Sequence, residues 1–280
     1  YGCVSHRSID NVENDIFFLT RNGIYVLGDE PNYLSTIRTN ELSARIHPEI
    51  EAVNPTNYTN ATALFNQYVF YLGIPSGGVT ANNVTLTYDR RFLAWSKLTH
   101  IQPECFSVYT DSTNTDVIYF TSSSSANVYK FTSNYDSNGS AISAQWTSKF
   151  FDLGDFSAYK RFIFADILFR QLSGTIQIDV YTDNGTLSKS TSISTSQSGG
   201  MGTNILGGGD WLGGTVSASS SGTTTSSTNI PYRIKLNKKA RGVKIKISNS
   251  RVNESFTVLG IKLHYRPYSA FIFPSSQKLT

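Results

Sequence analysis

Cysteine is scarce in this chain, and the scarcity excludes one class of small secreted protein. Cys3 and Cys105 are the only two cysteines among 280 residues, so at most one intramolecular bridge is available. Secreted scaffolds that replace a hydrophobic core with disulfides carry more of them. We therefore interpret both as free thiols, in a chain long enough for two domains that each bury an apolar core.

Long apolar runs and a strong charge of one sign are missing as well. No stretch approaches the length of a membrane-spanning helix, so we expect no membrane segment. Charged residues make up 16% of the chain, and 24 basic against 20 acidic residues leave a formal net charge of +4. This balance does not indicate a protein that holds nucleic acid by neutralising many phosphates, although transient contact stays open.

Compact catalytic patterns are also absent from the sequence. The histidines His6, His47, His100 and His264 are spread over the chain without the spacing of metal ligands. No Gly-x-Ser-x-Gly elbow, phosphate-binding glycine loop or Cys-x-x-Cys pair occurs. We expect no catalytic residue, no metal site and no cofactor.

One group of aspartates could suggest glycoside cleavage, which needs two carboxylates facing each other across a groove. The group consists of Asp152, Asp155, Asp166, Asp179 and Asp183. Several of them lie at predicted strand ends or turns, where aspartate serves the backbone, so structural roles explain the group better. The sequence Asp183-Asn184-Gly185 lacks the regular oxygen spacing of a calcium loop and predicts a hairpin turn.

Short β-prone segments joined by polar turns fill the first half, in keeping with 13% aromatic residues. Residues 14–20 and 24–27 flank Asn22-Gly23, a pair that readily takes the positive backbone angles of a tight hairpin. Further strands are predicted at 67–72, 84–88, 92–95, 106–109, 117–121 and 128–131. Strands without intervening helices are typical of a propeller, barrel or sandwich.

Residues 40–54 break this β pattern. Apolar side chains recur there at helical spacing, at Leu42, Ile46, Ile50 and Val53. Asn40 is a suitable N-cap, and Pro48 can begin a second short turn. We predict one or two short helices whose apolar stripe packs against a sheet.

The second half has longer strands. Residues 159–170 carry apolar side chains on both faces, with Phe162, Phe164 and Leu168 on one and Ile163, Ala165, Ile167 and Phe169 on the other. This predicts a strand covered on both sides. Residues 175–182 alternate, with Ile176, Ile178 and Val180 inward and Gln177 and Asp179 outward.

Three more alternating segments follow, at 232–236, 243–247 and 259–265, the last with Leu259, Ile261, Leu263 and Tyr265 in phase. Together the five strands predict an antiparallel, jelly-roll-like β-sandwich. A basic run accompanies them, formed by Lys235, Lys238, Lys239, Arg241, Lys244 and Lys246. It could meet phosphate, but because it alternates with core residues we interpret it as a solvated sheet face.

A Gly-, Ser- and Thr-rich insert occupies residues 188–229. A structureless insert of this length is typical of a functional loop or a linker. Its apolar anchors predict that it docks, either onto its own sandwich or onto a neighbouring subunit. Met201, Leu206 and Trp211 are the candidate subunit contacts.

The whole pattern predicts an all-β chain with two domains. Residues 1–140 form a propeller-like domain of hairpins with a short helical insert, and residues 141–270 form the sandwich that carries the 188–229 insert. Residues 271–280 are a C-terminal tail. The boundary is expected near Asn138 to Ala144, where polar turn residues separate short strands from long ones.

Several segments carry a resemblance to a known family. They are Gly2-Cys3-Val4-Ser5, residues 14–19 with 22–25, residues 42–50, Tyr68-Val69-Phe70-Tyr71 and residues 84–95. They resemble the late part of propeller-bearing tail proteins of tailed bacteriophages, above all the nozzle proteins of short-tailed phages, also called tail tubular protein B or tail accessory factor. Residues 146–154, Lys160, 242–250 and 260–267 resemble the sandwich that follows such propellers.

The resemblance implies a non-enzymatic structural protein of the virion tail. Six copies would form a ring that is part of the DNA exit channel and a platform for other tail proteins, with the genome passing through transiently. The first half supplies only about three blades, whereas closed propellers have about four to eight. Either further blades precede this chain, or the hairpins close against another chain.

Two alternatives come from other classes of protein. A carbohydrate-binding tail or cell-surface adhesin module is one, because sandwiches often bind glycans through loops with exposed aromatics, and Trp211 lies on such a loop. A glycan hydrolase is the weaker one.

Overall fold

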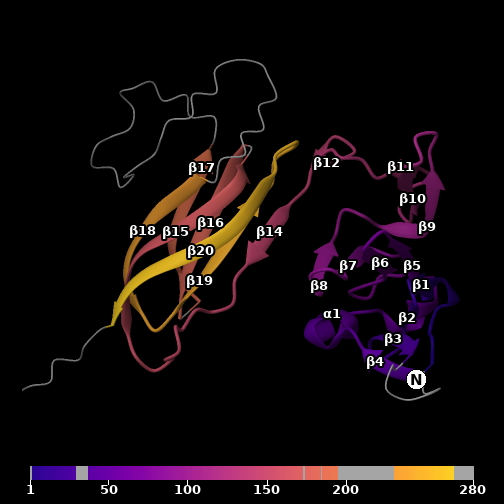
Figure 1. The fold of residues 1–280 in the computed structure, drawn as a ribbon, viewed down its shortest axis with the longest axis horizontal. Coiled ribbons are helices and arrows are strands. Elements are labelled where there is room, and N and C mark those ends of the chain that lie inside the picture. Colours follow the sequence, from indigo (N-terminus) through magenta and orange to yellow (C-terminus); the bar gives the residue numbers. More distant parts are fainter. Residues whose placement is uncertain (1, 30–36, 173, 184, 195–229, 268–280) are drawn as a thin grey trace, which may run out of the picture. The chain divides into compact units, whose positions relative to one another are not determined.

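The computed structural model describes residues 2–29, 37–172, 174–183, 185–194 and 230–267 (Figure 1). The chain divides into two compact units, Tyr1–Ser133 and Asn134–Thr280. Strands dominate both units, so the expectation of an all-β protein is confirmed. The expected boundary at Asn138 to Ala144 lies just beyond the division between the units.

Three antiparallel meanders make up the first unit, and in each of them consecutive strands are neighbours. The first contains β1 (Asp10–Val12), β2 (Asp15–Leu19), β3 (Ile24–Asp29) and β4 (Ile37–Glu41). The second contains β5 (Thr62–Asn66), β6 (Val69–Ile74), β7 (Val84–Asp89) and β8 (Ala94–Leu98). The third contains β9 (Pro103–Thr110), β10 (Asp116–Ser122) and β11 (Val128–Lys130).

The meanders pack against one another in chain order. One apolar cluster joins the first two sheets, with Phe17 of β2 edge-on to Phe70 of β6 at a centroid distance of 5.2 Å. A smaller cluster joins the second sheet to the third through Tyr71 and Phe106. Such sheet-on-sheet packing of consecutive meanders is the arrangement of neighbouring propeller blades.

A partly exposed ion-pair network reinforces the contact between the first two meanders. Arg90, which follows β7, donates to the carboxylates of Glu13 and Asp15 at 2.8 and 2.9 Å and to the carbonyl of Val12 at 3.1 Å. Because one guanidinium serves three acceptors around the β1–β2 turn, it fixes the register of that hairpin against the second sheet.

The helical segment differs from the expectation in its bounds. Asn40 does not cap a helix but pairs with Val26 in the β3–β4 ladder. The helices begin later, with a 3-10 turn η2 (Ala44–Ile46), the short α1 (His47–Glu51) and a second 3-10 stretch η3 (Pro55–Asn60). Strand pairing has overridden the local capping preference here, while the inward packing of Ile50 and Val53 agrees with the expected stripe.

The β2–β3 hairpin forms without the backbone angles expected for Asn22-Gly23, since neither residue has positive φ. Thr20 Oγ1 instead accepts from both of their amides at 3.2 Å. Glycine is required at position 23 for space, because a Cβ there would lie 2.6 Å from Oγ of the buried Ser43. The turn after β7 also differs, since Phe92 lies in the turn and not in β8.

Two sheets that share one core form the second unit. The first sheet has the order β14–β19–β16–β17 and the second the order β18–β15–β20. Their bounds are Ala144–Thr147 for β14, Lys160–Leu172 for β15, Thr175–Thr182 for β16, Leu187–Ser194 for β17, Ile230–Ala240 for β18, Val243–Asn249 for β19 and Phe256–Pro267 for β20. Every connection except the β16–β17 hairpin passes from one sheet to the other, as the two layers in Figure 1 show.

The sandwich core comes from both sheets. Among its fully buried side chains are Phe162, Ala165, Ile167, Ile176, Ile178, Ile245 and Ile247. The alternation predicted for β16 and β19 is confirmed, because Ile178 and Ile247 face each other across the ladder and both point inward. A small hairpin, β12 (Asp136–Ser137) and β13 (Ser140–Ala141), precedes the sandwich, with Asn138 and Gly139 at positive φ.

The side-chain alternation of β15 changes phase in the middle of the strand. Its register shifts between Phe162 and Phe164 against both neighbouring strands. As a result Phe162 shares the inner face with Ala165 and Ile167, while Phe164 lies on the outer face and is half-buried. The predicted division of this strand into two apolar faces holds from Phe164 onward and was wrong for Phe162, because the bulge exchanges the two faces at that point.

Strand β20 keeps its predicted phase from Ile261 to Tyr265, because Leu263 lies opposite the buried Ala165 and Tyr265 opposite the buried Phe162. Leu259 departs from this phase, since the register shifts between Leu168 and Phe169 and leaves Leu259 41% exposed. The residues that pack inward are Phe256, Val258, Ile261 and Leu263.

Lys160 is a buried cation at the start of β15, with 4% of its surface exposed. Its ammonium donates to three backbone carbonyls, those of Asp155, Ala158 and Arg241, the last two at 3.1 Å each. Three donors and three acceptors satisfy the charge without a carboxylate. The contacts tie the loop before β15 to the turn between β18 and β19.

We expect Lys160→Met to lower the free energy of unfolding by about 2 to 4 kcal/mol, because three partly buried carbonyls lose the donor that the buried ammonium supplies. The exposed Lys189 is the matched control, and Lys189→Met should change stability by less than about 0.5 kcal/mol. Urea denaturation followed by circular dichroism measures both. Equal stabilities of the two variants would contradict the structural role of Lys160.

Candidate functional site

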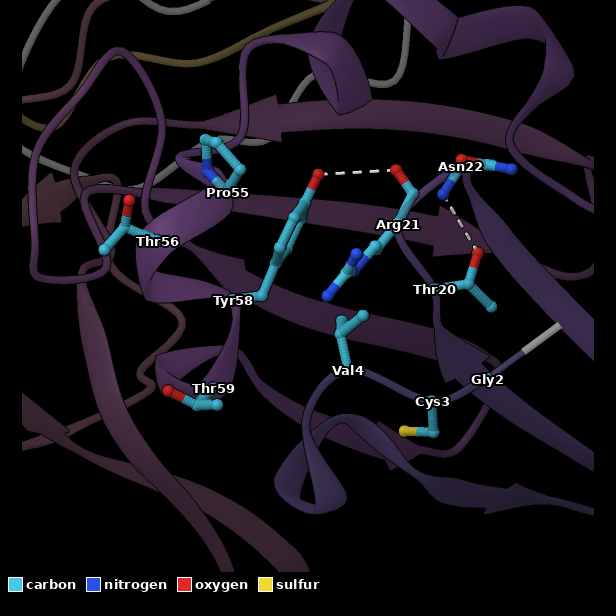
Figure 2. Close-up of a pocket in the computed structure, with 10 residues that line it drawn as sticks. All are labelled: Gly2, Cys3, Val4, Thr20, Arg21, Asn22, Pro55, Thr56, Tyr58 and Thr59. Carbon is cyan, nitrogen blue, oxygen red and sulfur yellow. Dashed lines mark hydrogen bonds between the residues drawn. The ribbon is translucent and has the colours of Figure 1, made fainter.

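A cavity of about 670 Å³ lies in the first unit, beside the β2–β3 turn (Figure 2). Its wall comes from Gly2–Val4, Thr20–Asn22, Pro55, Thr56, Tyr58 and Thr59. Figure 2 shows the Tyr58 hydroxyl reaching the carbonyl of Arg21, with the two oxygens 3.3 Å apart. The helix η3 therefore closes over the β2–β3 turn and leaves the hollow beside it.

This cavity has the size of a ligand site but little chemistry. Its lining contains no carboxylate and no imidazole, and its ionisable side chains are Cys3, Arg21 and Tyr58. The thiol of Cys3 donates to the carbonyl of Ser5 at 2.9 Å, and both Cys3 and Cys105 are free, as expected. Nothing in this wall can act as an acid–base pair.

Most of the candidate aspartates serve the backbone. Asp152 and Asp155 accept from amides two residues ahead, at 3.3 and 2.8 Å, and Asp183 accepts from the amide of Arg241 at 3.3 Å. The turn predicted after Asp183 is present, with Gly185 at a φ of +70°. These contacts are those of turn residues.

Asp179 differs from the expectation that it points to solvent, since it is 7% exposed. Its Oδ1 accepts from Ser190 Oγ at 2.7 Å and from Gln177 Nε2 at 3.1 Å. Both partners lie on the same pair of strands, β16 and β17. Two hydrogen bonds satisfy the carboxylate within the sheet, and neither partner is a second carboxylate.

Asp166 and His264 are the only two candidate residues that the structure brings together among those it describes. Arg233 forms a double hydrogen bond with Asp166, Nε to Oδ1 at 2.7 Å and Nη2 to Oδ2 at 2.9 Å, and His264 Nε2 lies 2.8 Å from Oδ2. The hydrogen bonds from Arg233, opposed in part by desolvation and aided by His264, lower the pKa of Asp166 to about 2. The carboxylate is thus an ionised anchor for the Arg233 guanidinium and the His264 ring, the opposite of a general acid.

The other histidines lie apart. His47 begins α1 beside Glu51 at 3.3 Å, His6 begins the 3-10 turn η1 (His6–Ser8), and His100 lies in the loop after β8, where burial lowers its pKa. In the part of the chain that the structure describes, no three His, Cys, Asp or Glu side chains could hold a metal ion together. Within the same part, every helix is too short or too polar to cross a bilayer.

The Asp166 cluster is the centre of a larger surface, the outer face of the β18–β15–β20 sheet. Residues directly opposite one another form rows across the three strands, and the outward rows are Lys239–Arg161–Arg266, Lys235–Phe164–His264 and Arg233–Asp166–Lys262. Arg170 extends β15 on the same side. We call this set of residues the cationic face. Its Lys and Arg side chains are all exposed, and Asp166 is its one acidic member.

The basic run seen in the sequence is divided by the fold. Lys235 and Lys239 belong to the cationic face, whereas Lys244 and Lys246 lie on β19, in the other sheet. Arg233 also lies on β18, and the other cations of the face come from β15 and β20, about seventy residues before and thirty residues after Lys235. Only strand pairing brings them together, so neither the run nor the net charge could reveal them.

The predicted subunit contacts Met201, Leu206 and Trp211 lie outside the described residues. A smaller hollow of about 420 Å³ lies on the sandwich unit, lined among others by Phe150, Tyr181, Asp183, Lys244 and Lys246. It combines two aromatic side chains, Phe150 and Tyr181, with polar groups.

Comparison with known proteins gives little guidance. No family model and no curated protein matches the chain. Among solved structures, an exo-β-1,3-galactanase of Phanerochaete chrysosporium with β-1,3-galactotriose aligns at 9% identity and a TM-score of 0.20, over 91% of this chain and 67% of that one. A likeness this weak carries no argument about fold or function.

The Asp166 cluster predicts a pH dependence. Because the pKa of Asp166 is about 2 in the folded protein and 3.8 as its ordinary value, its stabilisation is present above about pH 4 and is lost as the pH falls towards 2. At neutral pH we expect Asp166→Asn to lower the free energy of unfolding by at most about 2 kcal/mol.

The measurement is urea denaturation of both proteins between neutral and acidic pH. The difference in free energy of unfolding between the two proteins should shrink as the pH falls from about 4 towards 2. A difference that stays constant with pH would show that ionisation of Asp166 does not stabilise the fold.

Proposed function

We propose that this chain is a non-enzymatic structural protein of a phage tail, part of a ring through which DNA leaves the particle. The observation that carries the proposal is the first unit, a row of three meanders packed face to face in chain order. Closed propellers need about four to eight such sheets. The row is therefore the kind of structure that is completed by further sheets, from the same polypeptide or from another chain.

The third meander supports this interpretation through its exposed apolar surface. Its buried cluster is small, and Tyr109 and Val128 are 62% and 65% exposed. A sheet that ended a complete domain would turn polar side chains outward. An incomplete one leaves apolar side chains for its neighbour.

A second set of exposed aromatic and apolar side chains is suited to a protein–protein interface. At one end of the second meander, Arg91 lies over the rings of Tyr68 and Phe92, 4.9 and 5.3 Å from their centroids. Phe92 is 74% exposed and the adjoining Leu93 is 60% exposed. Tyrosine and arginine are enriched where protein interfaces gain most of their binding energy, and an exposed aromatic turn fits that pattern.

We expect Phe92→Ser with Leu93→Ser to weaken assembly while the thermal midpoint changes little, because both side chains are solvated in the isolated chain. Mass photometry and negative-stain electron microscopy measure the ring. Val79→Ser, at an exposed apolar residue elsewhere in the unit, is the control. A ring that forms equally well in the double variant would exclude this turn as a subunit contact.

The location itself is tested in purified virions. Immunogold labelling with antibodies against the chain should mark the tail, and substrate screens against polysaccharide, peptidoglycan and esters should show no turnover. Label on the capsid alone, or turnover abolished by Asp166→Ala or Asp179→Ala, would overturn the proposal.

The carbohydrate-binding alternative has one observation in its favour, the hollow beside Phe150 and Tyr181 on the sandwich unit. Aromatic edges next to polar groups can bind sugar rings. Saturable binding of a glycan, lost in Tyr181→Ala, would support an adhesin module. Immunogold label at the virion tail, together with no glycan binding by the chain, would support the structural role.

A further inference from the structure

We propose that the cationic face binds the phosphate backbone of duplex nucleic acid without regard to sequence. The inference deepens the proposed function, because it gives the tail protein a surface that meets DNA, but the charges of the face carry it by themselves. The proposed binding of nucleic acid does not depend on the protein being located in a phage tail.

The first argument is that the face places like charges opposite one another. Lys239, Arg161 and Arg266 form one row across three neighbouring strands, which are about 4.8 Å apart. Like charges directly opposite in a sheet are destabilising. Because the row destabilises the sheet through repulsion, an anion that binds there and neutralises its charge would stabilise the protein.

The second argument is that three exposed cations of the face lack an acidic partner among the described residues. Asp166 is the single carboxylate of the cationic face, and Arg233 and His264 already occupy both of its oxygens. In the described ranges, Lys235, Lys262 and Arg266 have no carboxylate within ion-pair distance. These three side chains are exposed and can meet an external anion.

The third argument is that several cations are held in place. Asn237 Oδ1 accepts from Nε and Nη2 of Arg161 at 3.1 and 2.8 Å, so this guanidinium lies along the sheet. Arg233 is fixed by Asp166 and by the ring of Phe164, 5.1 Å from its centroid. Cations held in this way lose less conformational entropy when they bind a phosphate.

The chemistry of the face favours phosphate over sugar. A glycan site needs open acceptors for hydroxyl groups, yet the acceptors of Asp166 and Asn237 are taken by arginines. The face also favours a duplex over a single strand. Single strands are held by aromatic rings on which bases stack, and the rings closest to this face, Phe164 and Tyr159, lie beneath Arg233, Lys239 and Arg241.

The test is fluorescence anisotropy of a labelled duplex of random sequence with the full chain, over a series of salt concentrations. Two variants are compared, Lys235→Gln with Lys262→Gln on the cationic face, and Lys189→Gln with Lys244→Gln on the other sheet. The two double variants lose the same charge, and all four lysines are exposed.

We expect the unchanged chain to bind the duplex, with an affinity that falls steeply as salt rises. The face variant should bind about tenfold more weakly or worse at low salt, and the slope of log affinity against log salt should fall by about 1.8, or 0.9 per lost phosphate contact. The control variant should keep both the affinity and the slope.

Three outcomes would overturn the inference. These are absence of duplex binding at low salt, equal loss in both double variants, and stronger binding of a sulfated polysaccharide or a single strand than of the duplex. Absence of binding together with tail labelling in virions would refute this inference alone. Binding together with labelling elsewhere would refute the tail role alone.

Discussion

The second unit depends on a single irregularity in its central strand. Side chains of a strand alternate with a period of two, so one inserted residue exchanges the two faces for everything that follows. The shift between Phe162 and Phe164 in β15 allows Phe162 and Ala165 to enter the same core. It also puts Arg161 on the same outer side as Asp166, which a regular strand would not do. Core and cationic face are therefore two results of one bulge.

The sequence predicts what depends on local pattern. The alternation of β16 and β19, the turn at Gly185 and the all-β class follow from residues close together in the chain. What failed mostly depends on partners far away, apart from the Asn22-Gly23 turn, whose amides donate to the nearby Thr20. Asn40 is a good N-cap, but its pairing with Val26 decides its structure, and the extra residue in β15 leaves no mark in the composition of the strand.

The cationic face shows that a candidate functional surface is equally hard to predict when its residues lie far apart in the sequence. Its rows join β15 with strands about seventy to a hundred residues later, and the nearly balanced total of +4 conceals it. Asp166 illustrates how the role of a residue changes with its surroundings. In the sequence it is one of several acids that suggest catalysis, whereas in the fold it holds Arg233 and His264 in position.

Lys160 and the lysines of the cationic face differ in which substitutions they tolerate. On the face, arginine can replace lysine, since only a solvated positive charge is needed. At position 160 the ammonium must fit among three carbonyls, those of Asp155, Ala158 and Arg241. Arginine is planar and too wide for this arrangement, and methionine has no donor. Position 160 is thus the charged site of the sandwich where variation among related chains should be smallest.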